Sequence, residues 1–188
     1  MRKVLILGLI AVLFVSVLSL TGYGGEKSTP DPKDFVTYKS PQGLFELMVP
    51  KGLPVMREHK YGIVYGSPDA DMIIAGGVRL FDEKDEVKVD MAYIKEKVDE
   101  TIKDIMKSNK GEKVVEGPKE YKNGIFMIME TENPPFPPKE EQKEKKKYYL
   151  TMYVTVKNEK SLALIAYFPK DKYPDFKKDV EFMIDHLK

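Results

Sequence analysis

Histidine and cysteine, the residues most often used for nucleophilic, acid–base or metal chemistry, are scarce in this sequence. Of 188 residues none is cysteine and two are histidine, so catalysis through a thiol is excluded. A metal site needs several converging ligands and a histidine base needs a partner, and neither His59 nor His186 has such residues nearby in the sequence. A Gly-Xaa-Ser-Xaa-Gly nucleophile motif is also absent. We interpret both histidines as structural and predict a protein that is not an enzyme, without catalytic residues, metal ligands or a cofactor.

Two short acidic motifs could bind a hard cation. One contains Asp69 and Asp71, and the other runs from Asp82 to Glu86. A calcium loop of the EF-hand type needs alternating acids, a central glycine and a distant glutamate, and neither motif has that spacing. We interpret the first motif as a solvated turn and the second as acids that precede the start of a helix.

Four tyrosines are candidates for binding a partner. Tyr149 and Tyr153 lie on one side of a strand pattern, and together with Tyr61 and Tyr65 they could form an aromatic binding face. Aromatic residues are enriched at protein interfaces. Tyrosine also suits strands that a helix covers, so both interpretations remain open.

A basic run is the second candidate for binding a partner. Its lysines are Lys143, Lys145, Lys146 and Lys147. They could contact an anionic lipid or an acidic partner, or could simply be solvated. The run ends a segment from residue 133 to 147, "NPPFPPKEEQKEKKK", whose prolines and charges cannot form a sheet ladder or a core. We predict that this segment is a long exposed excursion between two strands.

The remaining sequence divides into strand and helix patterns that must position these residues. Strands are predicted where apolar residues alternate with polar ones or form short runs between turn signals, at 45–49, 61–67, 72–81, 113–121, 125–131, 148–157 and 161–168. Asn123-Gly124 is the dipeptide that a two-residue hairpin turn prefers. Gly76-Gly77 within a strand indicates a bulge or a close packing contact, with a ligand approaching the backbone as the alternative.

Two helices are predicted from apolar residues spaced three and four apart. The first carries apolar residues from Met91 to Ile105, with Asp90 as N-cap and Gly111 as its stop. The second closes the chain, with Phe176, Val180, Met183 and Leu187 on one side. Short hairpin links and strands that are apolar on both faces predict an α+β fold with a mainly antiparallel central sheet and a helix packed on each face, a three-layer α/β/α sandwich.

The first 24 residues have the composition of an export signal. Arg2 and Lys3 precede an uncharged run from Val4 to Leu20, and small residues follow. We predict that 1–24 is a signal peptide or an N-terminal anchor, and cleavage is left open because the run is near the length of a spanning helix. Tyr23 stands where the cysteine of a lipoprotein signal would be, so the chain cannot be lipidated there. Residues 25–33 are predicted to be a tether, and 34–188 a single domain.

Charge and composition restrict the partners further. The formal net charge is +1, and it becomes −1 when Arg2 and Lys3 are removed with the signal. Such a balance gives no argument for nucleic acid. Abundant lysine and glutamate suggest a heat-adapted source.

The domain resembles a known family in its opening and its end. The opening reads "Y.SP.G.F.L.VPKG" from Tyr38 to Gly52, and the terminal helix ends in "F.KDVEFMIDHLK". Together with the mid-chain helix and late hairpin, these segments resemble the PsbP-like fold family. That family includes the photosystem II extrinsic subunit, a Ran-binding transport factor and DcrB-type envelope lipoproteins. The resemblance implies a binding or accessory protein, without shared catalytic residues.

Two functions follow as hypotheses. The first is a non-catalytic, lipoprotein-like envelope protein that acts as an interaction or accessory module, with an envelope protein as its partner. The alternative is a carrier that binds a small apolar ligand between sheet and helix. Either would be exported to the periplasm or the outer surface of the cytoplasmic membrane, close to the membrane through its N-terminus. The sequence leaves the oligomeric state open.

Overall fold

The computed structural model describes residues 30–68, 71–78, 89–108, 112–133 and 146–188. The whole predicted signal, most of the tether, most of the excursion, the second acidic motif and the predicted helix stop Gly111 lie outside these residues. The strands are β1 Phe35–Lys39, β2 Glu46–Pro50, β3 Val55–His59, β4 Gly62–Ser67, β5 Met72–Val78, β6 Lys113–Tyr121, β7 Gly124–Thr131, β8 Tyr148–Lys157 and β9 Lys160–Pro169. The helices are α2 Met91–Ser108 and α3 Tyr173–Asp185, with short 3₁₀ turns η1 Pro32–Asp34 and η2 Lys170–Lys172.

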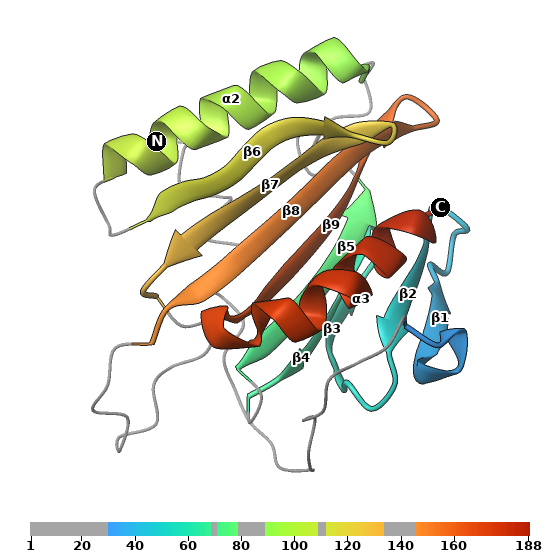
Figure 1. The fold of residues 1–188 in the computed structure, drawn as a ribbon. Coiled ribbons are helices and arrows are strands. Elements are labelled where there is room, and N and C mark those ends of the chain that lie inside the picture. The colour runs from blue at the N-terminus through green and yellow to red at the C-terminus, as the bar shows by residue number, and fades with distance from the viewer. Residues whose placement is uncertain (1–29, 69–70, 79–88, 109–111, 134–145) are drawn as a thin grey trace.

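Seven strands form one antiparallel sheet in the order β3-β4-β5-β9-β8-β7-β6 (Figure 1). Each neighbouring pair is antiparallel, including β5 with β9, which are distant in the sequence. The mainly antiparallel α+β fold predicted from the short links is therefore confirmed. In the described part of the chain, neither helix is long and apolar enough to cross a membrane.

A small second sheet pairs β1 with β2. In the turn before β2, the Ser40 hydroxyl accepts hydrogen bonds from the amides of Leu44 and Phe45 at 2.7 and 3.1 Å. The other edge of β2 is paired with the chain end, because Glu46 and Lys188 exchange two backbone hydrogen bonds of 2.6 and 3.1 Å. The C-terminus and the start of the domain are thus fixed to each other.

Buried side chains form two large clusters. We call them the α2 cluster and the α3 cluster, after the helix that packs on each. The α2 cluster contains aliphatic side chains and methionines: Val89, Ile94, Val98, Ile125, Met127, Met129, Met152, Val154 and Ala163. The α3 cluster is larger and rich in aromatic rings, including Phe35, Phe45, Tyr65, Phe126, Tyr153 and Phe168. Successive residues of β7 alternate between the clusters, since Phe126 and Ile128 belong to the second. This is the period of two of a strand with both faces covered.

Gly76 and Gly77 are close packing contacts and not a bulge. They continue the regular β4–β5 pairing, with Gly76 opposite Ile63. A Cβ on Gly76 would lie 2.7 Å from Leu47 Cδ2, and one on Gly77 would lie 2.5 Å from the carbonyl oxygen of Tyr61. The missing side chain of Gly76 therefore lets β2 pack onto the central strand β5.

Local signals located the helices and turns, with one correction. The amide of Tyr93 donates to the Asp90 carboxylate at 2.8 Å, which confirms the N-cap. The β6–β7 hairpin turn is Lys122–Asn123, one residue before the predicted Asn123-Gly124. Gly124 instead lies in β7, where a Cβ would meet the Val154 carbonyl oxygen at 2.5 Å.

Candidate interaction surface

The four candidate tyrosines lie on the α3 side of the sheet but in two separate places. Tyr65 and Tyr153 are buried in the α3 cluster, and Tyr61 and Tyr149 pack against it partly exposed. β5 and β9 lie between β4 and β8 in the sheet. At the first place, on β4, the ring centroids of Tyr65 and Tyr38 lie 6.4 Å apart. The structure therefore does not join all four tyrosines into one face.

The basic run is described at its end. Lys146 forms an ion pair with Asp71 at 3.2 Å, and Lys147 forms one with Glu130 at 3.1 Å. The amide of Lys170 donates to the carbonyl oxygen of Lys147 at 2.8 Å, which holds this backbone against the sheet. Lys143 and Lys145 lie outside the described residues.

The edge strand β6 brings charged side chains to the α3 side. In its antiparallel pairing with β7, Glu116 lies opposite Ile128 and Lys119 lies opposite Phe126. Directly opposed residues project from the same face of a sheet. Because Ile128 and Phe126 belong to the α3 cluster, Glu116 and Lys119 also face the α3 side.

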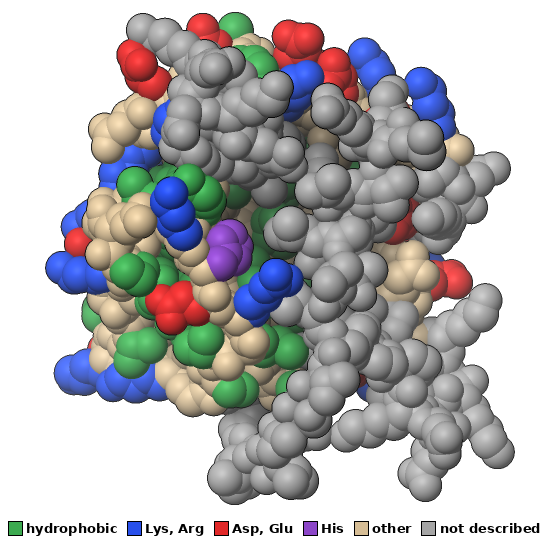
Figure 2. Space-filling view, turned by 180° about the vertical axis from the view of Figure 1, so that it is seen from behind, with side chains coloured by type: hydrophobic (Ala, Val, Ile, Leu, Met, Phe, Trp, Pro, Cys, Tyr) green, Lys and Arg blue, Asp and Glu red, His purple; other side chains and the backbone are tan. Residues whose placement is uncertain are grey.

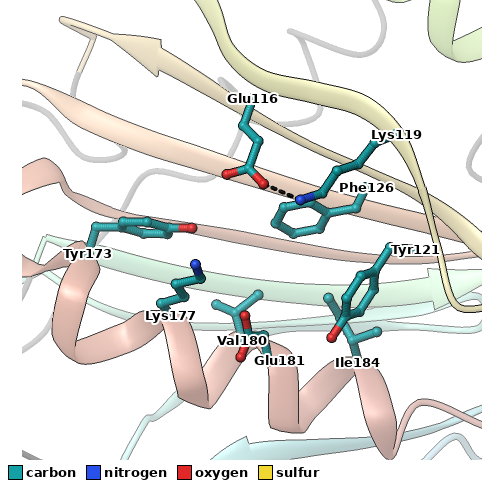
Figure 3. A pocket seen from close by; sticks show the side chains of 9 residues that line it. All are labelled: Glu116, Lys119, Tyr121, Phe126, Tyr173, Lys177, Val180, Glu181 and Ile184. Carbon is teal, nitrogen blue, oxygen red and sulfur yellow. Dashed lines mark hydrogen bonds and ion pairs between the residues drawn. The ribbon is translucent and has the colours of Figure 1, made fainter.

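A pocket lies between this edge and the helix (Figure 3). α3 packs against β2 and β9, and it faces β6 and β7 across the pocket. The α3–β6 pocket is lined by Glu116, Lys119, Tyr121, Phe126, Tyr173, Lys177, Val180, Glu181 and Ile184. The lining is thus mixed, with apolar side chains from strand and helix and charges of both signs.

Lys119 connects the charged and aromatic parts of the pocket. Its ammonium group forms an ion pair with Glu116 and lies 5.6 Å from the centroid of the Phe126 ring. The Phe126 ring lies 5.9 Å from that of Tyr121. A cation near an aromatic face is stabilised by the ring's quadrupole, so this part of the pocket is held by its own contacts.

Tyr173 forms the other end of the pocket. Its ring stacks on Phe168 at 5.9 Å and meets Tyr149 edge-on at 5.2 Å. Burial, with Glu116 and Glu181 nearby, raises the pKa of Tyr173 to about 12. Its phenol, like that of an ordinary tyrosine, is protonated at neutral pH and can donate a hydrogen bond.

Beyond Tyr149, a cluster of lysines surrounds one carboxylate. Glu130 is buried, and its Oε1 lies 3.2 Å from Lys113 Nζ and 3.1 Å from Lys147 Nζ, while its Oε2 lies 2.6 Å from Lys170 Nζ. Hydrogen bonds from Lys170, and then from the other two lysines, lower the pKa of Glu130 to about 2. We call these four residues the lysine cluster.

Tyr149 joins the lysine cluster to the α3–β6 pocket. The Lys170 ammonium group lies 5.5 Å from the centroid of the Tyr149 ring, and that ring contacts Tyr173 of the pocket. The two features therefore form one continuous surface beside α3. On the reverse side of the molecule, the described basic and acidic side chains are interspersed (Figure 2).

Both histidines make local contacts within the fold. The Nδ1 of His59 accepts from the amide of Tyr61 at 3.2 Å in the β3–β4 turn, and burial lowers the pKa of His59. The ring of His186 lies 2.8 Å from the Phe182 carbonyl oxygen and 4.2 Å from the Phe182 ring. Among the residues that the structure describes, no group of three His, Cys, Asp or Glu side chains could hold a metal ion.

Sequence reasoning identified Tyr149 and Lys147 but missed most of this surface. Lys113 and Lys170 are separated from Glu130 by 17 and 40 residues, so their convergence depends on strand pairing. One signal was available. Glu130 is a charged residue within the apolar run of β7, "GIFMIMET", and a charge in a buried strand needs partners.

Comparison with known proteins gives the fold. No protein-family model and no curated protein matched the chain. Among solved structures, cyanobacterial PsbP (CyanoP) from Synechocystis sp. PCC 6803 is similar at 11% identity with a TM-score of 0.51, covering 90% of this chain and 98% of CyanoP. The Ran-binding protein Mog1p of Saccharomyces cerevisiae is similar at 8% identity with a TM-score of 0.50, covering 82% and 94%. A Mog1 mutant gives a TM-score of 0.51. The chain therefore has the fold shared by PsbP and Mog1, as its opening and closing segments indicated.

Proposed function

We propose that this protein is a non-catalytic interaction or accessory module whose partner binds beside α3. The observation that carries the proposal is the continuous surface formed by the α3–β6 pocket, Tyr149 and the lysine cluster. It combines partly exposed aromatic rings, a residue type enriched at protein interfaces, with exposed charged side chains of the kind found at the polar rim of an interface. Tyr149 and Lys147, two residues of the candidate binding set, lie in it.

The proposal includes the arrangement of the helices. We place α2 and α3 on opposite faces of the large sheet, as the outer layers of a three-layer α/β/α sandwich. The alternation of β7 residues between the two clusters supports this arrangement. In that arrangement the β6 edge is covered by α2 on one face and is left accessible beside α3 on the other.

Export to the cell envelope is the second part of the proposal. It rests on the composition of residues 1–24 and on Tyr23 at the lipoprotein position. The protein would then act in the periplasm or on the outer surface of the cytoplasmic membrane, held near it by an uncleaved anchor or released by cleavage. Labelled palmitate should not enter the chain, whereas the Tyr23→Cys variant should incorporate it and move to the membrane fraction.

The aromatic side chains packed beneath α3 support a protein partner over a small apolar ligand. The rings of Phe168 and Phe176 stack at 5.6 Å, and the Phe168 side chain is fully buried. Side chains of this cluster fill the space between β9 and α3, and the α3–β6 pocket at the sheet edge is lined in part by the charged side chains of Glu116, Lys119, Lys177 and Glu181. One neighbour in fold, Mog1p, is a Ran-binding protein, which agrees with a binding function for this fold.

The test combines a pull-down from envelope extract with native mass spectrometry of the purified chain. We expect one or more proteins to be recovered, and expect recovery to fall with Tyr173→Ala but not with Lys103→Ala, an exposed change on α2. A bound small molecule in native mass spectra, with no protein recovered, would instead establish the carrier.

A further inference from the structure

We propose that the lysine cluster is a binding site for an acidic segment of the protein partner, one that carries neighbouring aspartate or glutamate side chains. This inference rests on the proposed function and specifies the chemistry of the partner. It concerns Lys113, Lys147 and Lys170 as the binding residues, with Glu130 as the residue that positions them.

The first argument is the charge of the cluster. One lysine is sufficient to neutralise the Glu130 carboxylate, but three ammonium groups lie within 3.2 Å of its oxygens. Two of them, from Lys113 and Lys147, share a single oxygen. Like charges at such separation repel each other, so a purely structural ion pair does not account for the second and third lysines. The four residues together carry a net charge of +2.

The second argument is the accessibility of the lysine side chains. An ammonium group has three N–H donors, and Glu130 can occupy only part of this capacity. The side chains of Lys113, Lys147 and Lys170 are 63%, 49% and 43% exposed, whereas Glu130 is 5% exposed. The negative charge is therefore buried beneath the positive ones, and donors remain available to a ligand from solvent.

The third argument is preorganisation. The three lysines come from the start of β6, the residue before β8 and the 3₁₀ turn η2, and Glu130 holds their flexible side chains in one place. Binding by free lysines loses the entropy of each long side chain. Here Glu130 has already restricted that freedom, so a second anion binds at a lower entropic cost.

The surroundings favour a peptide over other anions. Two other acidic residues, Asp71 and Glu116, are already paired with Lys146 and Lys119. They therefore do not occupy the lysine cluster, which can accept an added carboxylate. Tyr149 continues the surface into the α3–β6 pocket, which offers apolar contacts to the side chains of a peptide. A membrane surface is bound instead by a broad basic face, and this chain has 31 basic and 30 acidic residues.

The experiment measures binding of a fluorescein-labelled oligoglutamate peptide to the full chain by fluorescence anisotropy. The double variant Lys113→Gln/Lys147→Gln removes two charges from the cluster. Its control, Lys95→Gln/Lys97→Gln, removes two charges from α2, where these lysines pair with Glu120 and Glu100. We expect the first to weaken binding about tenfold or more and the second to leave it within about twofold. Thermal unfolding of the control should match the parent, and that of the cluster variant should fall only slightly, because Lys170 still pairs with Glu130 and the changed lysines are exposed.

Two further measurements complete the test. One distinguishes an acidic peptide from a lipid surface, and the other distinguishes failure of this inference from failure of the proposed function. Equal weakening by both double variants would overturn the site, as would binding that neither affects. Vesicles of phosphatidylglycerol and phosphatidylcholine test a lipid surface: if they bind through the lysine cluster while oligoglutamate does not bind, the acidic-peptide assignment is wrong. If a recovered partner is lost with Tyr173→Ala but kept with Lys113→Gln/Lys147→Gln, the proposed function stands and this inference fails.

Discussion

The cluster beneath α2 and the cluster beneath α3 cover the same strands with different chemistry. Beneath α2 the buried side chains are aliphatic or methionine, and their contribution is burial of apolar area. Beneath α3 the buried set includes phenylalanine and tyrosine rings, and partly exposed tyrosines extend it to the pocket and the lysine cluster. The α2 side therefore explains stability, and the α3 side contributes to stability and also holds the proposed binding surface.

The largest expected effect is a loss of folding stability from a change on the α2 side. Ile94 is fully buried in the α2 cluster, so Ile94→Asp places an unpaired charge there and should cost several kcal/mol, about 3 or more. Lys103→Asp puts the same residue on the exposed side of the same helix and should change stability by about 0.5 kcal/mol or less. Urea unfolding measures both. Equal effects would contradict the assigned helix face.

The next effect concerns how β2 joins the α3 cluster. Gly77→Ala should cost more than Gly76→Ala, because its Cβ meets backbone atoms of Tyr61 and Gly62 whereas that of Gly76 meets the end of the Leu47 side chain. Overpacking of this kind costs about 1 to 3 kcal/mol. Thermal unfolding gives the order of the two variants. The reverse order would show that Leu47 is held more rigidly than the strand backbone.

A smaller effect tests the charge beside the α3 cluster. The pKa of Glu130 is lowered from 4.5 to about 2, so its stabilising contribution is present above pH 4.5 and is lost as the pH falls towards 2. Glu130→Gln should cost about 1 kcal/mol at pH 7, a modest value because the lysines are partly exposed. The difference from the parent should shrink as the pH falls from 4.5 to 2. A difference that is constant with pH would mean that Glu130 is not paired as described.

The last pair of variants sharpens the comparison within one strand. Phe126 and Met127 are neighbours that belong to different clusters. Phe126→Leu should lose about 1 kcal/mol of ring contacts with Tyr121, and Met127→Leu should lose less than about 1.5 kcal/mol. Partner binding distinguishes them, since we expect it to weaken only with Phe126→Leu. Weakened binding by Met127→Leu would remove the division between the two sides.

The sequence predicted those parts of the fold that depend on local patterns. Apolar alternation located β8, apolar runs next to turn signals located β7 and β9, and spacings of three and four located both helices. β1 and β3 were not predicted, because Phe35–Lys39 and Val55–His59 are both largely exposed and lack a continuous apolar face. The hairpin turn was displaced by one residue because Gly124 is required for packing against Val154 and not for the turn.

The candidate site was less accessible to sequence reasoning. Tyr65 and Tyr153 have the strand spacing of a binding face, but both are buried in the α3 cluster. Spacing assigns residues to a face without saying what covers it. The lysine cluster combines residues from β6, β7, the residue before β8 and the turn η2, and their contact depends on which strands become neighbours. A single sequence does not specify that neighbourhood.

The central claim is that partners bind beside α3, and site-specific photo-crosslinking in cells tests it most directly. A photoreactive residue replaces Lys177, which lines the α3–β6 pocket, or Lys103, which is exposed on α2. Both are exposed lysines on helices, so the positions differ mainly in which side of the molecule they sample. We predict a crosslinked protein from the Lys177 position and little or none from the Lys103 position. Crosslinking from Lys103 that equals or exceeds that from Lys177 would contradict the account.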